Sequence, residues 1–254
     1  MLSANGIRSC RNKMKFQFYK CTDNYVLKNQ DRIVEIATLA FRSIPREEVV
    51  ERFSKYDDIL LIIDENQEIQ GFNFLSEHRN GKTLLVGGRL VAIDPKLKGK
   101  GLLRTASVRL FIRYYIKLLK ESVLGQTNQL FLFSRQCNPI AYCLLNIGQE
   151  IYPDLINKTK VQNTMSISAL DQFKFLKKEL QLDNLDVHTG IVQMGAVNAG
   201  INSATKGFFA DWKTPWSEYV PEGSELITIF PITPLFPLKY FPSFGRRVIK
   251  SINF

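Results

Sequence analysis

The stretch DPKLKGKGLLRTA, residues 94–106, decides how this chain is interpreted. It holds four basic residues and two glycines in thirteen positions, directly after an apolar run and directly before a long helical pattern. The N-terminus of a helix has unpaired N–H groups and about half a positive charge, and glycines let a phosphate approach that backbone closely. The stretch therefore predicts a phosphate-binding loop between a strand and a helix. The alternative interpretation is a basic surface turn.

The spacing of this glycine loop (residues 94–101) excludes the two commonest phosphate loops. Gly99 and Gly101 would allow the close approach, and the positive charge would come from Lys96, Lys98, Lys100 and Arg104. The chain has no G-x-x-x-x-G-K-[ST] and no G-x-G-x-x-G, so neither a P-loop nor a dinucleotide fold is indicated.

The segments before the loop alternate in type. Lys15–Cys21 has apolar residues at every second position, as a half-buried strand does, and Ile33–Phe41 has helical spacing. Pro45 suits the start of a second helix. Ile59–Ile63 is apolar throughout, which is typical of a central strand.

Two more strands and a helix surround the loop. Ile69–Leu75 and Leu84–Ile93 are predicted to pair through a hairpin at Asn80-Gly81. The helix after the loop has an apolar face, and a second face is marked by Thr105, Arg109, Arg113 and Lys117. Basic residues repeated in this way usually form a solvated helix surface.

Composition indicates an ordinary globular protein of 254 residues, one large domain or a domain with an extension, with 45% hydrophobic and 23% charged residues. No apolar run reaches the length of a membrane span and the N-terminus lacks a secretory pattern, so we expect a cytoplasmic protein with reduced cysteines. The four cysteines and two histidines do not cluster, so no metal site is expected. The net charge of +10 favours an acidic partner.

Residues 91–106, VAIDPKLKGKGLLRTA, resemble the acyl-CoA-binding motif of the GNAT N-acyltransferase superfamily, in which a strand ending in V-x-P is followed by [QR]-x-x-G-x-[GA] at the start of a helix. Residues 137–148, CNPIAYCLLNIG, resemble the next element of that family, where an asparagine after a strand begins a helix. The order of predicted elements also agrees, and the resemblance covers about residues 15–150.

The resemblance implies an α/β fold with a mixed, mostly antiparallel central sheet flanked by helices and followed by a C-terminal extension. It divides the chain into an N-terminal segment (1–14), an acyl-CoA-binding core (15–155) and a C-terminal part that completes the sheet (156–254). The implied activity is transfer of an acetyl or longer acyl group from acyl-CoA, as co-substrate and without a metal, to a primary amine of a small molecule, peptide or protein.

The resemblance also implies the positions that bind the donor. The strand that pairs with the pantetheine arm would be Leu90, Val91, Ala92 and Ile93. The residues around the pyrophosphate would be Lys98, Gly99, Lys100, Gly101, Leu102, Leu103 and Arg104. Asn138 would touch the pantetheine or the thioester; its alternative role is that of a helix cap alone.

The chain departs from the family pattern at several positions. Lys98 replaces the usual Gln or Arg, and Leu103 replaces the last small residue. The family often has a tyrosine as general acid where this chain has Leu145, so Tyr142 is the candidate acid, with a core position as its alternative. A general base must deprotonate the acceptor amine, and the candidates are Glu77 and His78, whose alternative is solvated surface.

The last hundred residues carry fewer signals. Leu170–Leu182 is predicted to be a helix and Glu225–Phe230 a strand that completes the sheet. The Pro- and Phe-rich end, residues 230–254, is expected to wrap over the core as a strap; alternatively, its aromatic residues line an acyl or acceptor pocket. Its basic residues would suit an acidic acceptor, a carrier protein or a membrane surface.

Two other functions remain open. An enzyme of similar fold could take its acyl group from an acyl carrier protein, or the chain could bind acyl-CoA without catalysis, which Leu145 would favour. Nucleic-acid binding is not indicated, because the aromatic residues do not interleave with the lysines as a stacking groove requires.

Overall fold

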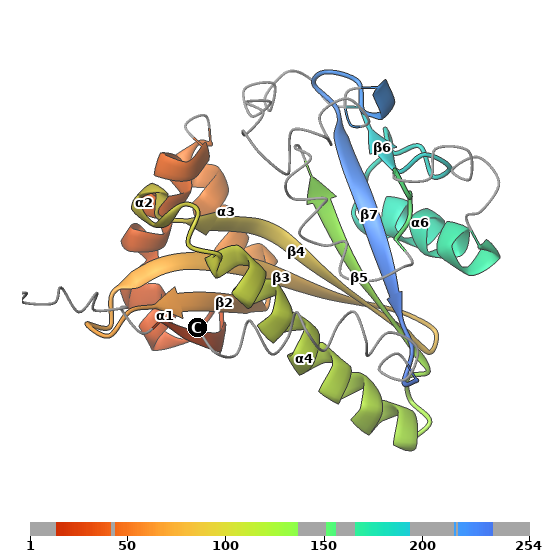
Figure 1. The fold of residues 1–254 in the computed structure, drawn as a ribbon, viewed down its shortest axis with the longest axis horizontal. Helices are drawn as coiled ribbons and strands as arrows, with labels where there is room; N and C mark the ends of the chain where they lie inside the picture. The colour runs from red at the N-terminus through yellow and green to blue at the C-terminus, as the bar shows by residue number, and fades with distance from the viewer. Residues whose placement is uncertain are drawn as a thin grey trace, which may run out of the picture.

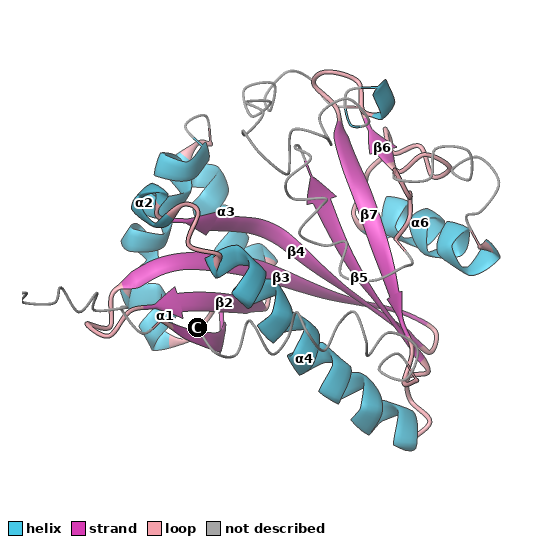
Figure 2. Cartoon of the chain, viewed as in Figure 1, coloured by secondary structure: helices cyan, strands magenta, loops and turns pink. Residues whose placement is uncertain are grey.

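The structure is a computed structural model, and it describes residues 14–41, 44–136, 151–155, 166–193, 216 and 218–235. Two groups of helices cover one face of a twisted sheet, and one long helix crosses the other face (Figures 1 and 2). The fold is therefore mixed α/β, as predicted. Asn138 and Tyr142 lie outside the described residues, as does most of the C-terminal strap.

The sheet has seven strands in the order β1-β2-β3-β4-β5-β7-β6. Among the described strands, the β4–β5 pair is parallel and every other pair is antiparallel, which confirms the predicted mostly antiparallel sheet. The strands are β1 (Lys15–Lys20), β2 (Asp58–Ile63), β3 (Ile69–Asn80), β4 (Thr83–Ile93), β5 (Gln129–Gln136), β6 (Ile191–Val192) and β7 (Glu225–Ile232).

The helices bury three apolar clusters against this sheet. Helix α4 (Leu102–Val123) packs on one face, hereafter the α4 face, over β2, β3, β4, β5 and β7. On the opposite face, α2 (Gln30–Phe41) and α3 (Arg46–Lys55), with the short α1 (Asn24–Lys28), cover β2 and β3. Helix α6 (Ile167–Glu179) covers β5 and β7 on that same face. The glycine loop contains a short 3-10 turn, η1 (Pro95–Leu97).

The predicted apolar face of α4 is confirmed by the burial of Leu110, Phe111, Tyr114 and Leu118. The opposite stripe is only partly a solvated surface. The Lys117 ammonium pairs with the Glu77 carboxylate of β3, and the Arg113 guanidinium lies 4.3 Å from the centre of the Phe18 ring. These contacts fix the C-terminal half of α4 on the sheet.

Strand β3 is longer than the predicted Ile69–Leu75, because the polar residues at its end, from Glu77 to Asn80, find partners on α4 and α6. His78 contacts Glu179 of α6, Arg79 donates to Glu121 of α4, and Asn80 donates to Gln172 of α6. Glu77 and His78 therefore lie inside a paired strand and not at a solvated tip. Helix α1, of 5 residues, and strand β6, of 2 residues, were not predicted, because segments this short carry no periodic signal.

Candidate functional site

The glycine loop presents unpaired N–H groups at the start of α4. Gly101 is the N-cap residue with φ of 75°, and Gly99 has φ of 84°; both values lie in the left-handed region that favours glycine. The first intrahelical bond runs from the Thr105 N–H to the Gly101 carbonyl, so the N–H groups of residues 102–104 have no acceptor among the described residues. A Cβ added at either glycine would meet nothing within 4 Å, so the loop backbone faces open space.

Basic side chains surround this backbone without acidic partners. Lys98, Lys100 and Arg104 are exposed, and none of them forms a salt bridge with a residue that the structure describes. Leu103, the departure from the family pattern, is half-buried at the first turn of α4. Positive charge and free N–H groups therefore coincide at one end of the helix, as an anionic ligand requires.

Asp94 holds the loop in place. Its side chain is 4% exposed; one carboxylate oxygen accepts from the Lys96 N–H at 3.0 Å and the other pairs with Arg32 of α2 at 2.7 Å. Burial opposes ionisation of this carboxyl, but the Lys96 N–H and the Arg32 guanidinium outweigh it, so the pKa of Asp94 is lowered. The position of the loop thus depends on a helix about sixty residues earlier in the chain.

Strands β4 and β5 diverge beside the loop. Their parallel pairing runs from Thr83–Gln129 to Gly88–Ser134 and stops there, although β4 continues to Ile93 (Figure 1). The register between β3 and β4 shifts at the same point, where Phe74 pairs with Leu90 and Leu75 pairs with Gly88. Arg89 is left as the extra residue of a β-bulge, which increases the local twist. Residues 90–93 therefore keep β3 on one edge and have no described strand on the other.

Two buried amide oxygens lie beside this divergence on the α4 face. Asn73 alternates with Phe72 and Phe74, which face α2 and α3, and Gln136 continues the row of Leu130 and Leu132, which face α4. The oxygens Asn73 Oδ1 and Gln136 Oε1 are buried and have no hydrogen-bond partner among the described residues. Buried acceptors of this kind are rare in folded proteins and can receive N–H donors from a ligand.

The two candidate bases lie on opposite faces of the sheet. Glu77 is on the α4 face, where it pairs with Lys117 and lies beside Tyr114; burial first, and then the Glu77 charge, raise the pKa of that tyrosine. His78 is on the other face, with Nδ1 at 3.2 Å from Glu179 Oε1 and with Nε2 buried and unpartnered among the described residues. The structure therefore separates two residues that are adjacent in sequence.

Arg89, Asn73 and Ser76 were not among the sequence candidates. Each carries a buried polar atom that has no partner in the described part of the chain. A signal was present in the sequence, since Arg89 and Asn73 are single polar residues within the otherwise apolar stretches LLVGGRLVAI and GFNFL. The direction of Arg89 depends on the bulge in β4, and that of Asn73 on which face of β3 is covered by α2 and α3.

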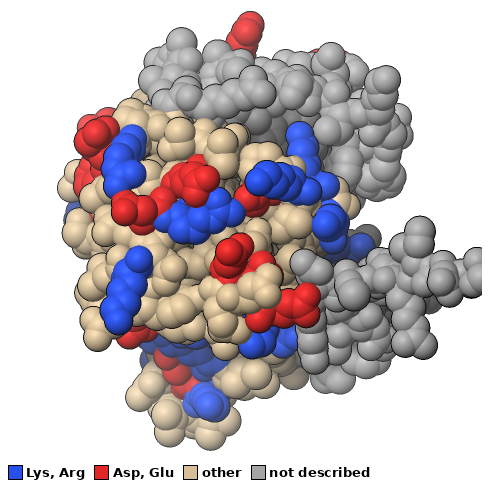
Figure 3. Space-filling view, turned by 90° about the vertical axis from the view of Figure 1, so that its left-hand side faces the viewer, with Lys and Arg blue, Asp and Glu red and all other residues tan. Residues whose placement is uncertain are grey.

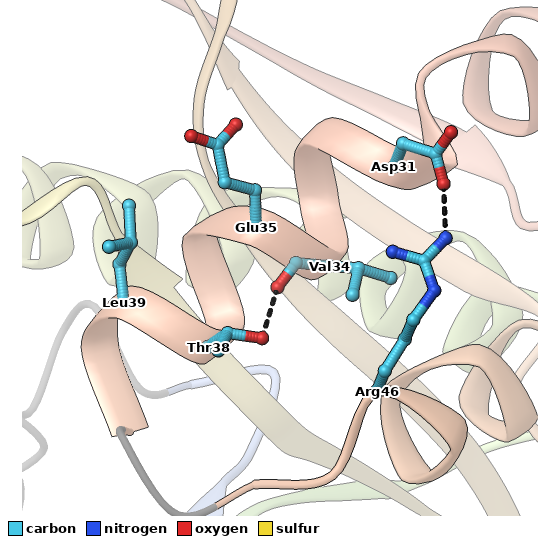
Figure 4. A pocket seen from close by; sticks show the side chains of 6 residues that line it. All are labelled: Asp31, Val34, Glu35, Thr38, Leu39 and Arg46. Carbon is cyan, nitrogen blue, oxygen red and sulfur yellow. Dashed lines mark hydrogen bonds and ion pairs between the residues drawn. The ribbon is translucent and has the colours of Figure 1, made fainter.

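A groove on the outer side of α2 is not part of this site. In Figure 4, Arg46 reaches Asp31, and the Thr38 hydroxyl donates to the Val34 carbonyl at 3.0 Å. Glu35 pairs with Arg32, so the charged groups of the groove are satisfied locally. Acidic and basic side chains also alternate over the neighbouring surface (Figure 3). The groove is lined by Asp31, Val34, Glu35, Thr38, Leu39 and Arg46.

Comparisons with known proteins add the following findings. No protein-family model and no curated protein matches the chain. Solved structures similar to the chain include GNAT acetyltransferases. Tetrahymena GCN5 matches with a TM-score of 0.41 and 9% identity over 87% of this chain and 97% of that one. The GNAT family N-acetyltransferase YhbS of Escherichia coli, in complex with CoA, has a TM-score of 0.35 and 14% identity over 53% of this chain and 68% of that one.

Among the described residues, no helix combines the length and apolarity that crossing a membrane requires. The described residues also contain no group of three His, Cys, Asp or Glu placed to hold a metal ion.

Proposed function

We propose that the protein is an N-acyltransferase that binds acyl-CoA across the glycine loop and the β4–β5 divergence. The observation that carries the proposal is that β4 loses its β5 partner directly before the loop whose N–H groups face open space. One continuous path then offers phosphate donors at one end and an unpaired strand edge at the other. A diphosphate joined to an extended arm with amide groups has the matching chemistry.

The donor would be held by backbone groups more than by side chains. The pyrophosphate would accept from the N–H groups of residues 102–104, with Lys98 and Lys100 adding charge. The pantetheine arm would pair with the free edge of residues 90–93 as an added strand does. Its amide N–H groups would meet the unpartnered oxygens of Asn73 and Gln136. The thioester would then lie in the gap between β4 and β5.

The chemical step is direct attack of a neutral amine on the thioester carbon. The C–N bond forms, the C–S bond breaks, CoA leaves as a thiolate that takes up a proton, and the amine loses one. Holding both reactants in the gap supplies the orientation, and free N–H groups on the edge of β4 would stabilise the oxyanion. The acceptor is a primary amine of a small molecule, peptide or protein.

His78 is the base that the geometry supports. Its contact with Glu179 orients the ring and leaves Nε2 as the proton acceptor, whereas Glu77 is neutralised by Lys117 on the other face. His78 pairs with Leu85, three residues before Gly88, which is about 10 Å along the strand. We therefore assign it proton removal through a water molecule. Tyr142 stays the predicted acid for the leaving thiolate.

The test is to mix the protein with acetyl-CoA or longer acyl-CoA and a panel of amines, and to follow free thiol and the acylated product by mass spectrometry. We expect both to appear, and His78→Gln to lower kcat at least tenfold with little change in acyl-CoA affinity. Acyl-CoA binding without product would identify a noncatalytic binder. Product from acyl carrier protein thioesters alone would select a carrier-dependent enzyme.

A further inference from the structure

A polar cluster interrupts the apolar face opposite α4, between the area covered by α2 and α3 and the area covered by α6. Ser76 and His78 follow Phe74 on this face of β3, and Arg89 joins them from the bulge of β4. Each has a buried polar atom without a partner among the described residues: Ser76 Oγ, His78 Nε2 and Arg89 Nη1. Three such atoms in one place are unusual, because burial of a polar group without a hydrogen bond destabilises a fold.

Arg89 lies over two aromatic rings. Its Cζ is 5.6 Å from the centre of the Tyr56 ring and 5.8 Å from that of the Phe133 ring, and its Nε donates to the Tyr56 hydroxyl at 3.2 Å. No salt bridge in the described part of the chain includes Arg89. The two rings attract the guanidinium through cation–π contacts, while its charge has no counter-ion among the described residues.

Phe133 brings the cluster together. Its ring lies so close over Gly87 that an added Cβ there would come within 2.3 Å of a ring carbon. Ser76 is the strand partner of Gly87, and the centre of the His78 ring is 6.0 Å from that of Phe133. The three polar residues therefore surround one aromatic ring, directly beside the last β4–β5 pair, Gly88 and Ser134.

The cluster is on the side from which an acceptor would reach the thioester. The glycine loop leads into α4, so a donor held there approaches the gap from the α4 face, and the nucleophile has to enter from the opposite face. Arg89 follows the last β4–β5 pair directly, and its side chain lies on that opposite face. An anion on Arg89 would place an amine a few ångströms away, between the gap and His78.

From this geometry we infer that the acceptor is an amine that also carries an oxyanion, a carboxylate or a phosphate, and that Arg89 and Ser76 bind this group. The inference rests on the proposed function for the role of the amine. A planar guanidinium binds carboxylate or phosphate oxygens through paired N–H donors, and the Ser76 hydroxyl supplies one more donor. The excess of 34 basic over 24 acidic residues agrees with a negatively charged substrate.

Binding is measured first, because it does not depend on catalysis. The probes are N-acetylated amino acids, the N-acetylated amines that lack the carboxylate, and N-acetyl aminoalkyl phosphates, each titrated by calorimetry in the presence of CoA. We expect the carboxylate or the phosphate series to bind about ten- to a hundredfold more tightly than the uncharged series. The tighter of the two anionic series identifies the group. Equal affinity of all three series overturns the inference.

Variants then assign the preference to Arg89. Arg89→Met is expected to reduce the preference for the anionic series to near one, and Arg89→Lys to retain part of it. The matched control is Arg109→Met, which removes an exposed arginine of α4 and should leave the preference unchanged. Should Arg89→Met not fold, Ser76→Ala tests the same site, with an expected loss of about threefold to tenfold. A preference that stays at its wild-type size in both Arg89→Met and Ser76→Ala contradicts the assignment.

Turnover of the corresponding free amines separates this inference from the proposed function. We expect kcat/KM for amino acids or aminoalkyl phosphates to exceed that for the matching plain amines by about tenfold or more, and Arg89→Met to remove the difference. Transfer to plain amines and anionic amines at equal rates overturns the inference and retains the proposed function. Anion binding at Arg89 without transfer to any amine contradicts the proposed function and retains the anion site.

Discussion

The two halves of strand β4 differ in pairing, burial and chemistry. Residues 83–88 are paired on both edges, and Leu84, Leu85 and Val86 are buried. Residues 90–93 are paired on one edge alone among the described strands, and Val91 is 38% exposed. The change occurs at the two glycines and the bulge that separate the halves. A single strand can therefore serve as core in one half and as a binding edge in the other, and the proposed site begins where the pairing stops.

The largest effect is expected on acetyl-CoA binding, from charge reversal in the glycine loop that follows the second half of β4. Lys98→Glu with Lys100→Glu should weaken acetyl-CoA binding by about a hundredfold, because two attractions to the diphosphate become repulsions. Isothermal titration calorimetry measures this. The control is Lys82→Glu with Lys120→Glu, which makes the same change in net charge with exposed residues at the other end of β4 and α4. Equal weakening by both pairs would mean that net charge alone governs binding.

A matched pair of valines tests the difference in packing between the halves. Val86 is 1% exposed and Val91 is 38% exposed. Val86→Ala should lower the free energy of unfolding by about 2 kcal/mol, since it removes two methyl groups from a filled core, and Val91→Ala by less than about 0.5 kcal/mol. Urea denaturation compares the two variants. Similar losses would show that residues 89–93 are packed as tightly as residues 83–88.

The anchor at the end of β4 should give a pH-dependent effect. Asp94→Asn is expected to lower the free energy of unfolding by about 1–2 kcal/mol at pH 7, because Arg32 loses its contact with a carboxylate. The pKa of Asp94 is lowered in the fold, so its contribution is complete above the unfolded value of about 4 and is lost as the pH falls below that value. The stability difference between wild type and Asp94→Asn should therefore shrink between about pH 5 and pH 3.

The control for this experiment is Asp31→Asn. Asp31 also pairs with an arginine, Arg46, but the Asp31 side chain is 86% exposed. Asp31→Asn should therefore lower the free energy of unfolding only slightly at every pH. A pH-independent difference for Asp94→Asn would contradict the assignment of the anchor to the ionised carboxylate.

The smallest effect is expected at Asn73. Asn73→Leu keeps the size of the side chain and removes a buried oxygen that has no partner among the described residues, so stability should be unchanged or slightly higher. Acyl-CoA binding should weaken by about threefold to tenfold, since one acceptor for the pantetheine amides is lost. Thermal unfolding and calorimetry measure the two quantities. A clear loss of stability would indicate that Asn73 supports the fold itself.

Much of the fold could be predicted from local pattern. The alternation in Lys15–Lys20, the apolar run of β2, the hairpin at Asn80-Gly81 and the apolar face of α4 are all confirmed. These elements were predictable because their periodicity depends on which face they bury. The second half of β3 was missed, because its polar residues are stabilised by partners on α4 and α6 that are distant in sequence.

The candidate site divides in the same way. The glycine loop could be located from sequence, and the structure gives Gly99 and Gly101 the left-handed backbone that only glycine adopts readily. The directions of Glu77 and His78 could not be assigned from sequence, because adjacent residues of a strand point to opposite faces of the sheet. Only the register of β3 shows which of the two residues lies on the α4 face. Arg89 was missed because its direction follows from a bulge.

The sequence by itself determined the order of the longer strands and helices, the glycine loop and its positive charge, because these follow from residue type and spacing within a few positions. Tertiary structure alone decided where β4 and β5 part, which polar atoms beside the gap have no partner among the described residues, and that Arg32 fixes Asp94. The physical reason is that strand pairing and burial are set by contacts between residues far apart in the chain, and no local pattern records them.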